Sequence, residues 1–449
     1  RNCLRRPWIC QLRTLHRRPA LMGCANGASK NSSSKKYEQI EDSGISSATG
    51  VTFDASVEVP LGKGDQSMPL GQSASWCQAL SLRSAISCVS TASIDQGDEL
   101  NIVVTCQEDV FREVGDDDLC LFGVTNKKGN GSLIIEAEFD DKDFAFSGMT
   151  SKQALLERLA SWPAGVACIK ARKPDHPNQD NLFICESNGL TAIGVADGHG
   201  EHGHWASHFV VQFILHLLFR DILPEGELPS DAEMYALFDT AHQALAIRFL
   251  ELGLSLDHSG TTLTICVIDH CANTVLTAWV GDSRCIHCTP VSTESLTVDH
   301  KPQDLPEMTR ILAHGGQIVA GRVVVEDLAS VYSDESCQPQ KASIAMSRAI
   351  GDVMFQRVGV SHRPMIKRTH LVNNQDTPLG EQFILCCSDG IWEYISNTEA
   401  ADIMRKYLPG RVTEGVEALV GESKKRWLER NSRTDDISCI ALLIGCATA

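Results

Sequence analysis

Residues 197–200 are the strongest candidate for chemistry in this sequence, an Asp-Gly-His-Gly run at the end of an apolar stretch. Glycine lets a backbone carbonyl oxygen approach an ion closely, and an aspartate at a strand end projects beyond the sheet. A single Asp-Gly pair, however, is most often only a turn. By itself, the run is therefore a weak indication of a cation site.

Four other aspartates are predicted to lie beside strand ends in the same way, and Asp389 shows the pattern clearly. It follows the very apolar run of residues 383–387, with one serine between them. The other three are Asp180, Asp282 and Asp435. Five such carboxylates are hard to explain as five turns. Because carboxylate and carbonyl oxygens suit hard cations, the set favours Mg²⁺ or Mn²⁺ over Zn²⁺.

The elements that must position these aspartates are predicted to be strands joined by tight turns. Apolar runs at 182–185 and 191–196 flank a Ser-Asn-Gly turn, and the second run ends at Asp197. A second pair of runs, 263–268 and 274–280, flanks another polar turn. Hairpin connections of this kind predict antiparallel sheets.

Helices are predicted in blocks between these hairpins. Apolar stretches of helical length cover residues 205–223 and 234–252, and a further helix is expected after Glu399. Strands in hairpins with helices in blocks predict an α+β fold and not a doubly wound parallel sheet. The longest apolar stretch, 208–219, is interrupted by polar residues and is too short to span a bilayer, so we expect no transmembrane helix.

Composition narrows the class of protein further. The 449 residues are 43% hydrophobic, which is enough for a sizeable core, and the formal net charge is −17. A general nucleic-acid binder needs a basic face, so this charge argues against one and fits metal ligation better. The 18 cysteines are spread irregularly over a long chain. This spacing favours reduced thiols in an intracellular protein over a disulfide framework.

Two other kinds of site are disfavoured by the residues around them. Residues 77–83 and 106–112 match a Cys-x5-Arg phosphatase loop, but neither is glycine-rich, and the second contains two acids that would repel phosphate. Cys285 and Cys288 have the spacing of half a zinc site without a second well-spaced Cys/His pair. We interpret these two thiols as alternating residues of a strand.

Together the aspartate motifs resemble the type 2C family of metal-dependent protein serine/threonine phosphatases. Four more motifs stand in the order of that family: Ser-Gly-Thr-Thr at 259–262, Asp-His-Lys-Pro at 299–302, Gly-Gly at 315–316 and Ser-Arg-Ala-Ile-Gly-Asp at 347–352. The resemblance covers about residues 165–444. It implies an α+β fold with four αββα layers, in which two antiparallel sheets flanked by helices carry a binuclear Mg²⁺ or Mn²⁺ centre at one edge.

The resemblance also implies roles for individual residues. Asp197 would bridge the two metals, and the carbonyl oxygen of Gly198 would bind one of them. Asp389 and Asp435 would complete the ligands of the other metal, while Asp282 with Asp389 would hold a weaker third ion. Two metals lower the pKa of a water molecule and clamp the attacking and leaving oxygens, so no protein nucleophile is needed.

His199 would be the general acid that protonates the departing serine or threonine oxygen, and with Asp197 it forms the expected catalytic pair. The alternative is that His199 only orients metal-held water. The nearby His202, His204 and His208 match no family motif. We expect these three histidines to lie on a helix surface or to pack in the core.

One region departs from the family pattern. Asp175 stands where many members carry a phosphate-binding arginine, five residues before Asp180, and Gln179 stands where the family often has glutamate. One metal would then be held with less charge. Arg172 or Lys173 is the candidate replacement for the arginine, although either could be a solvated loop charge.

The function implied is hydrolysis of phosphoserine and phosphothreonine on proteins, with phosphoprotein substrates as partners, no nucleic acid, and a monomeric chain. The alternative is a pseudophosphatase, a binding module that keeps the fold and holds a phosphoprotein without turnover. Such a module usually lacks a metal aspartate. Because all five aspartates are present, the sequence favours catalysis.

The first part of the chain carries two targeting signals of different kinds. Residues 1–21 contain six arginines and no acid, which is typical of an organellar presequence. A Met-Gly-Cys run then starts at residue 22 and is followed by lysines up to residue 36. If translation begins there, Gly23 is a candidate for myristoylation and Cys24 for palmitoylation, which together would anchor the enzyme to a membrane from the cytoplasm.

These signals and the motifs divide the chain into three parts. Residues 1–21 form the upstream segment, residues 22–150 an N-terminal extension that is expected to be partly disordered with accessory strands, and residues 151–446 the phosphatase domain. The extension mixes Ser, Gly and Asp with short apolar runs and shows no sustained periodicity. It suggests no function of its own.

Overall fold

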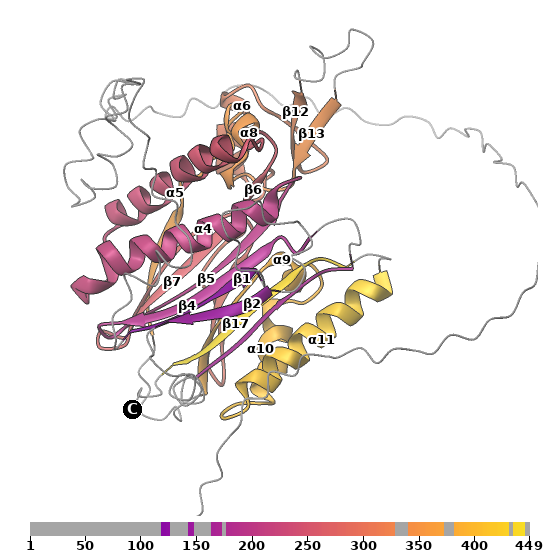
Figure 1. The fold of residues 1–449 in the computed structure, drawn as a ribbon. Helices are drawn as coiled ribbons and strands as arrows, with labels where there is room; N and C mark the ends of the chain where they lie inside the picture. Colours follow the sequence, from indigo (N-terminus) through magenta and orange to yellow (C-terminus); the bar gives the residue numbers. More distant parts are fainter. Residues whose placement is uncertain are drawn as a thin grey trace, which may run out of the picture. The chain divides into compact units, whose positions relative to one another are not determined.

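A computed structural model describes residues 118–125, 142–147, 163–172, 177–327, 340–371, 381–430 and 434–444 (Figure 1). The predicted lipidation sites Gly23 and Cys24 lie outside these ranges, as does Lys173.

The first sheet has nine strands within the described ranges. Its main path runs in the order β15-β8-β7-β5-β4-β1-β2, and the short strands β6 and β14 continue from the end of β5. All of these neighbours are antiparallel. The strands are β1 (Leu119–Thr125), β2 (Lys142–Ser147), β4 (Asp180–Ser187), β5 (Leu190–His199), β6 (Gly260–Thr261), β7 (Leu263–Asp269), β8 (Thr274–Val280), β14 (Ile350–Gly351) and β15 (Met365–His370).

A second antiparallel sheet has five strands in this part of the chain, in the order β10-β9-β16-β17-β3. They are β3 (Ala164–Ile169), β9 (Arg284–Cys288), β10 (Thr293–Ser295), β16 (Gln382–Cys387) and β17 (Ile437–Ile444). A small third sheet consists of β11 (Gln317–Val319), β12 (Arg322–Asp327) and β13 (Gln340–Ile344).

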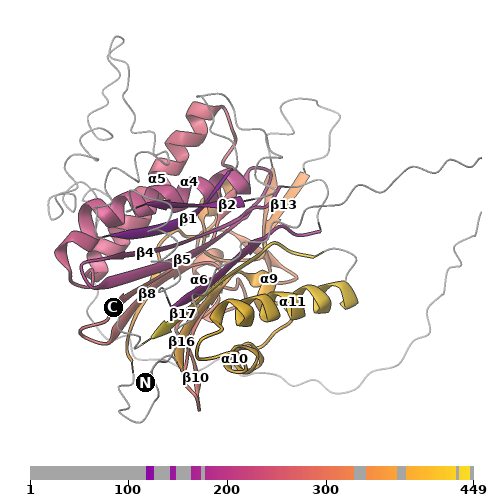
Figure 2. The same cartoon turned by 60° about the horizontal axis from the view of Figure 1, so that its bottom comes forward.

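Helices cover the outer faces of the two large sheets. Figure 1 and Figure 2 show α4 and α5 over the first sheet, and α10 and α11 over the second. The helices are α4 (Gly203–Leu217), which continues into the π-helical turn η3 (Leu218–Ile222) and the 3₁₀ turn η4 (Leu223–Glu225), α5 (Asp231–Leu252), α6 (Leu305–Ala313), α8 (Val353–Gln356), α9 (Asp389–Trp392), α10 (Asn397–Arg405) and α11 (Val412–Arg430).

The starts of α5 and α10 are defined by local sequence. In each, a serine precedes the helix and a glutamate follows three residues later, and their side chains bond each other's backbone N–H groups in a capping box. The pairs are Ser230 with Glu233, and Ser396 with Glu399. These caps satisfy N–H groups that a helix start otherwise leaves without partners.

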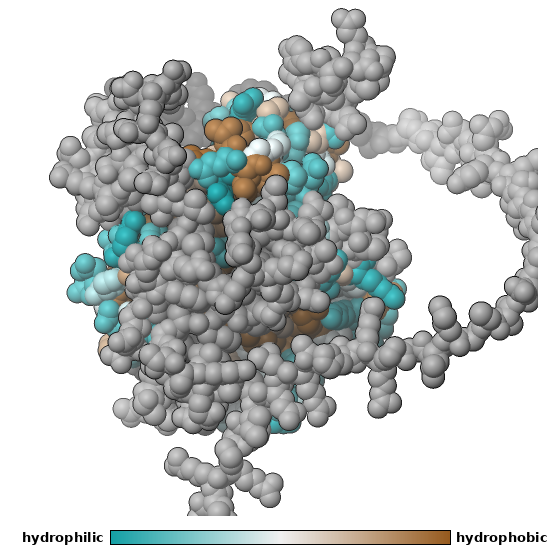
Figure 3. Space-filling model, viewed as in Figure 1, coloured by the Kyte–Doolittle hydropathy of each residue, from teal (hydrophilic) through white to brown (hydrophobic). Residues whose placement is uncertain are grey.

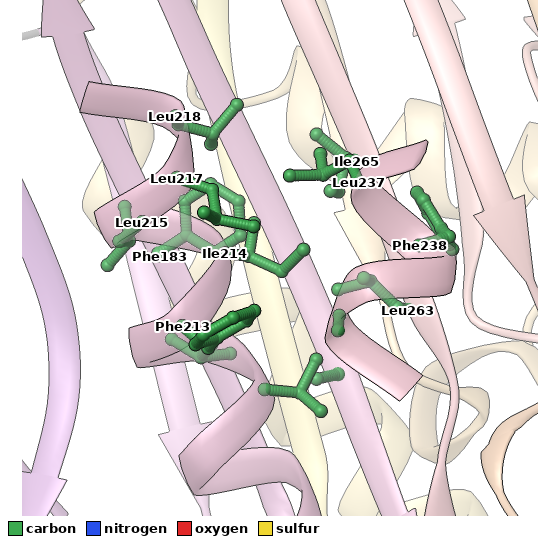
Figure 4. Close-up of a cluster of buried hydrophobic side chains, with 14 of the residues drawn as sticks. Phe183, Phe213, Ile214, Leu215, Leu217, Leu218, Leu237, Phe238, Leu263 and Ile265 are labelled. Atoms are coloured by element: carbon green, nitrogen blue, oxygen red, sulfur yellow. The ribbon is translucent and has the colours of Figure 1, made fainter. Parts of the chain in front are cut away.

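Alternating side chains of the first sheet build two different cores. In β4, Phe183 points to the helices, while Leu182 and Ile184 point to the second sheet. Figure 4 shows Phe183 beside Phe213 and Ile214 of α4. Because both faces of the strand are buried, its middle four residues, 182–185, are all apolar.

The second sheet is also buried on both faces. Ile384 of β16 and Ile440 of β17 belong to the core between the sheets, whereas Leu385 and Cys439 belong to the core under α10 and α11. The layers are therefore helix, sheet, sheet, helix. This arrangement confirms the predicted α+β sandwich with antiparallel sheets.

Both predicted hairpins are present, as β4-β5 and β7-β8, and the predicted helices correspond to α4, α5 and α10 with α11. Two strands lie within the expected N-terminal extension. The strands β1 and β2 precede residue 151, yet β1 pairs directly with β4 and contributes Phe122 to the core. The first sheet thus begins before the expected start of the phosphatase domain, because a run too short to show periodicity gains its stability from the strand beside it.

One helical stretch in the described ranges, Gly203–Glu225, is long and apolar enough to cross a membrane by length and composition. However, 89% of its most apolar window is buried within the fold. Such burial is typical of a core helix, so the stretch is only weak evidence for a membrane span.

The third sheet packs with α6 and α8 around a small core of its own that includes Ile311, Val323 and Phe355. Three apolar side chains here are more than half exposed: Leu305, Leu312 and Val319. In Figure 3 apolar residues gather at the top of the view, where Figure 1 draws α6 and α8.

Candidate metal centre

The five aspartates singled out by the sequence come together at one edge of the sandwich. Asp180 begins β4 and lies opposite Asp197 near the end of β5. Burial raises the pKa of Asp197 well above its usual value, and the negative charges of Asp180, Asp389, Asp435 and Asp282 raise it further. The carboxylates therefore lie close enough to repel one another strongly.

The pKa of Asp389 is shifted by the same kinds of interaction. Burial raises its pKa well above the usual value, the charges of Asp282, Asp435 and Asp180 add to this, and the cation of Lys301 opposes it. Such a group of buried carboxylates is stable only if protons or cations compensate the charge.

The donor set fits a hard divalent cation. It consists of carboxylate oxygens, and Oδ1 of Asp282 is buried with no hydrogen-bond partner among the described residues. Within those residues no three His, Cys, Asp or Glu side chains are gathered tightly enough to match a formed metal site. Charge–charge interactions act over longer distances than a ligand bond, so carboxylates that are not gathered this tightly still raise one another's pKa values.

Backbone contacts hold Asp197 in place. Its N–H donates to Oγ1 of Thr262 at 3.0 Å, and its carbonyl oxygen accepts from the N–H of Thr262 at 2.8 Å. The next residue has no room for a side chain, since a Cβ on Gly198 would lie 2.1 Å from the carbonyl oxygen of Gly203. Glycine is therefore required at position 198 by close packing against the start of α4.

Gln179 and Asp436 organise the loop that leads into β4. The Gln179 side chain donates to the carbonyl oxygen of Gly200 at 2.7 Å, which links this loop to the Asp-Gly-His-Gly run. Asp436 is buried, and its carboxylate accepts from the N–H groups of Ala171 at 2.5 Å and Gln179 at 3.0 Å. Sequence reasoning assigned no role to Asp436, although its position directly after Asp435 marked it as part of the motif.

His199 is paired with a fully buried acid. Its Nε2 lies 2.6 Å from Oδ2 of Asp352. Burial lowers the pKa of His199, but the charge and the hydrogen bond of Asp352 raise it more, so the net shift is upward. The ring therefore keeps its proton to higher pH, as a proton donor must. The sequence placed Asp352 in a motif without predicting this contact.

The Asp-His-Lys-Pro motif secures the neighbourhood of Asp282. Nζ of Lys301 donates to Oδ2 of Asp282 at 2.5 Å, while Asp299 accepts two hydrogen bonds from Arg284 at 2.9 and 2.7 Å. The Arg284 guanidinium also lies over the ring of Trp392, 5.2 Å from its centroid. These contacts fix the loop after β8, and none of them was predicted from the sequence.

The remaining predicted residues are placed as follows. Arg172 has an exposed side chain, and its N–H donates to Oγ1 of Thr434 at 2.6 Å, one residue before Asp435. His204 and His208 are buried in α4, as packing residues would be. The two cysteines of the Cys-x2-Cys pair are both buried in β9, which agrees with alternating strand residues.

Comparisons with known proteins identify a family for this chain. A family model described as "Protein phosphatase 2C" matches residues 187–415. The chain is 28% identical over 296 residues to "Probable protein phosphatase 2C 35" of Arabidopsis thaliana, which covers 60% of this chain and 80% of that protein. It is 27% identical over 317 residues to "Probable protein phosphatase 2C 12" of Oryza sativa subsp. japonica, covering 60% and 78%.

Among solved structures, the chain is similar to "serine-threonine phosphatase 2C from Toxoplasma gondii". The TM-score is 0.51 at 22% sequence identity, and the match covers 63% of this chain and 94% of that one. At this identity the likeness speaks for the fold alone.

Proposed function

This chain belongs to the protein phosphatase 2C family and is a protein serine/threonine phosphatase, and from this premise we propose that the edge with five aspartates is its Mg²⁺- or Mn²⁺-dependent catalytic site. The observation that carries the proposal is the strong upward shift in the pKa values of Asp197 and Asp389, which burial causes first and the negative charges of their neighbours increase. Carboxylates buried together in this way need a cation to be ionised.

The proposed ligands share one property, an oxygen atom at the acidic edge. They are Asp180, Asp197, the carbonyl oxygen of Gly198, Asp389 and Asp435 for two cations, and Asp282 with Asp389 for a weaker third ion. Bound there, the cations would lower the pKa of a water molecule and compensate the phosphate charge.

His199 is proposed to donate the proton that the departing serine or threonine oxygen needs. The contact with Asp352 supports this role, because it raises the pKa of the ring and limits its orientation. An alkoxide is a poor leaving group, and a placed acid typically accelerates such a step by about 100- to 10,000-fold.

Arg172 is proposed to bind the substrate phosphate, with Lys173 as the second candidate. Support comes from the hydrogen bond between the Arg172 backbone and Thr434, which places the start of this loop near Asp435. Guanidinium and phosphate form paired, charge-assisted hydrogen bonds.

The experiment that tests the metal site is phosphate release from a phosphoserine peptide by the purified chain, with and without Mn²⁺. We expect release to require the cation and to fall by at least about 100-fold in Asp197→Asn, since each aspartate compensates cation charge. Exposed Asp402→Asn, which changes one carboxylate on α10 that pairs with Arg405, is the matched control. Metal-independent turnover, or full activity of Asp197→Asn, would contradict the proposal.

The alternative pseudophosphatase is a separate outcome of the same experiment. A chain that binds the phosphopeptide in Mn²⁺ but releases no phosphate would support a binding module. Wild-type turnover excludes that alternative.

We also propose that the enzyme is intracellular and is held at a membrane by lipids on Gly23 and Cys24, provided that translation starts at Met22. The lysines that follow would add attraction to an anionic membrane surface. Fractionation of cells expressing the form that begins at Met22 tests this. Gly23→Ala should move the enzyme to the cytosol, and an unchanged distribution would refute the anchor. Delivery of the longer form to an organelle would favour a presequence in residues 1–21.

A further inference from the structure

Three short strand segments bring Asp352 beside His199. His199 of β5 pairs with Gly260 of β6, and Gly260 pairs with Gly351 of β14. A Cβ on Gly260 would lie 2.4 Å from Oδ2 of Asp352, so glycine is required for the acid to occupy this place. The contact between His199 and Asp352 therefore depends on where the backbone of residues 350–352 is held.

The backbone at Asp352 adopts a conformation that needs support. Its φ of 53° and ψ of 47° are left-handed, which is unfavourable for a residue with a side chain. Such conformations persist where surrounding contacts enforce them, often at functional sites. On one side, the N–H of Asp352 donates to the carbonyl oxygen of Ser259 at 2.9 Å.

On the other side, two side chains bond to Gly351. Its N–H donates to Nδ1 of His242 on α5 at 3.1 Å, and its carbonyl oxygen accepts from Nε2 of Gln356 on α8 at 2.9 Å. Both polar groups of the residue that precedes Asp352 are thus held by side chains. Neither His242 nor Gln356 belongs to a motif that the sequence identified.

The orientation of the Gln356 amide is determined by its partners. Nε2 donates to two carbonyl oxygens, those of Ala349 at 3.2 Å and Gly351, so Oε1 must face the other way. Oε1 lies 2.7 Å from Nδ1 of His362, which therefore donates. A third residue thus holds the amide that holds Gly351.

The His362 ring also braces His242. The two rings are stacked, with centroids 4.2 Å apart and an angle of 3° between their planes, and Nε2 of His362 lies 3.1 Å from Oδ1 of Asp239 on α5. Because Nδ1 of His242 accepts a hydrogen bond, its proton sits on Nε2. Burial, and then the charge of His362, lower the pKa of His242 to about 4, so this ring stays a neutral acceptor near neutral pH.

We infer that His242 and Gln356 are positioning residues for catalysis, which hold the peptide before Asp352 and through it the orientation of the His199 ring. The inference rests on the proposed role of His199 as proton donor. It assigns a function in the reaction to a cluster that touches neither the proposed ligands nor the substrate phosphate.

The test compares two substitutions of similar size that differ in one property. His242→Asn retains an acceptor near the Gly351 N–H, whereas His242→Leu leaves that N–H without one. Turnover is measured with a phosphoserine peptide and with p-nitrophenyl phosphate, whose leaving group needs no proton. We expect His242→Leu to lower kcat about tenfold on the peptide and less than about twofold on the aryl phosphate. His242→Asn should keep most of the wild-type kcat on the peptide.

The matched control is His270→Leu. His270 also makes one side-chain hydrogen bond, to Thr191 at 2.7 Å, but it follows β7 at the end of the sheet opposite His199. His270→Leu should leave the ratio of kcat on the peptide to kcat on the aryl phosphate unchanged. Gln356→Met, which removes both amide donors, should change the ratio as His242→Leu does, and it replaces that variant if His242→Leu does not fold.

Equal losses on both substrates, or no loss, in His242→Leu and Gln356→Met would overturn the inference. His199→Gln separates this failure from that of the proposed function. If His199→Gln changes the ratio and the cluster variants do not, only the inference is wrong. If His199→Gln leaves the ratio unchanged, His199 is not the proton donor and the inference fails with that role.

Discussion

The pKa values at two carboxylate sites in this protein shift in opposite directions. At the acidic edge, where the five aspartates come together, Asp197 and Asp389 lie among other acids, and their pKa values are raised. In α6, Glu307 is only 5% exposed, yet its pKa is lowered, since the effect of burial is outweighed by hydrogen bonds from Arg348, Arg310 and Ser347.

The contacts explain the difference. Glu307 accepts from Arg310 at 2.7 and 2.9 Å, from Arg348 at 2.6 Å and from Ser347 at 2.6 Å, so its charge is compensated within the fold. Among the five aspartates, Lys301 donates a hydrogen bond to Asp282 and acts on Asp389 through its charge, which leaves most of the negative charge uncompensated. Burial raises the pKa at both sites, so the charges of the partners determine the direction of the net shift. A fold that leaves buried charge uncompensated has left room for a ligand.

The largest effect on the unfolding free energy is expected from Glu307→Gln, which keeps the shape of the side chain and removes the charge that Arg310 and Arg348 share. Leaving two partly buried guanidinium groups without their acid should cost about 3 kcal/mol of unfolding free energy. Urea unfolding measures this loss. Glu294→Gln, which breaks an exposed pair with Lys367, should cost less than about 1 kcal/mol and serves as the control.

A similar loss should appear in the wild type when acid neutralises Glu307. Its folded-state pKa lies below the ordinary 4.5, so its stabilisation is fully present above that pH and is lost as the pH falls through the folded-state value. The gap in urea midpoint between wild type and Glu307→Gln should therefore narrow in acid. A gap that stays constant down to about pH 2 would show that the arginines do not distinguish the two residues by charge.

At the acidic edge, the unfolding free energy should depend on the proposed cation instead. At a Mn²⁺ concentration 100 times its dissociation constant, binding to the folded state should add about 2.7 kcal/mol to the unfolding free energy and raise the thermal midpoint. Mg²⁺ should act in the same direction. A thermal midpoint that does not respond to millimolar Mn²⁺ would contradict the proposal that the five aspartates, unlike Glu307, need a cation.

Asp389→Asn should separate stability from function. Without Mn²⁺ it removes one of several repelling charges, so the variant should be about 1 kcal/mol more stable than the wild type, opposite in sign to Glu307→Gln. Its activity and its response to Mn²⁺ should be lost. Metal-free destabilisation by Asp389→Asn would mean that this carboxylate is already compensated within the fold.

The smallest effect is expected from Arg172→Ala. If this exposed cation binds the substrate phosphate, the KM for a phosphoserine peptide should rise about three- to tenfold with little change in the unfolding free energy. Arg248→Ala, which removes a cation from α5 that pairs with Glu251, is the control. An unchanged KM would leave phosphate binding to the cations alone.

The sequence was sufficient for the acidic group and insufficient for the compensated one. Each of the five aspartates lies within two residues of a strand end, so the local sequence pattern was enough to predict Asp197 and Asp389. Glu307 and Arg348 are 41 residues apart, and His199 and Asp352 are 153 residues apart. Nothing in the local sequence of either member predicts such a pair, because only the folded chain brings them together.

Strand β1 has a practical consequence for anyone who divides this chain. Its pairing with β4 covers one edge of the first sheet, and Phe122 fills space against the helices. A recombinant fragment that starts at residue 151 would expose the backbone donors and acceptors of β4. Other chains could pair with this exposed strand, so the fragment should aggregate more readily. Fragments intended for crystals or assays should begin before residue 118.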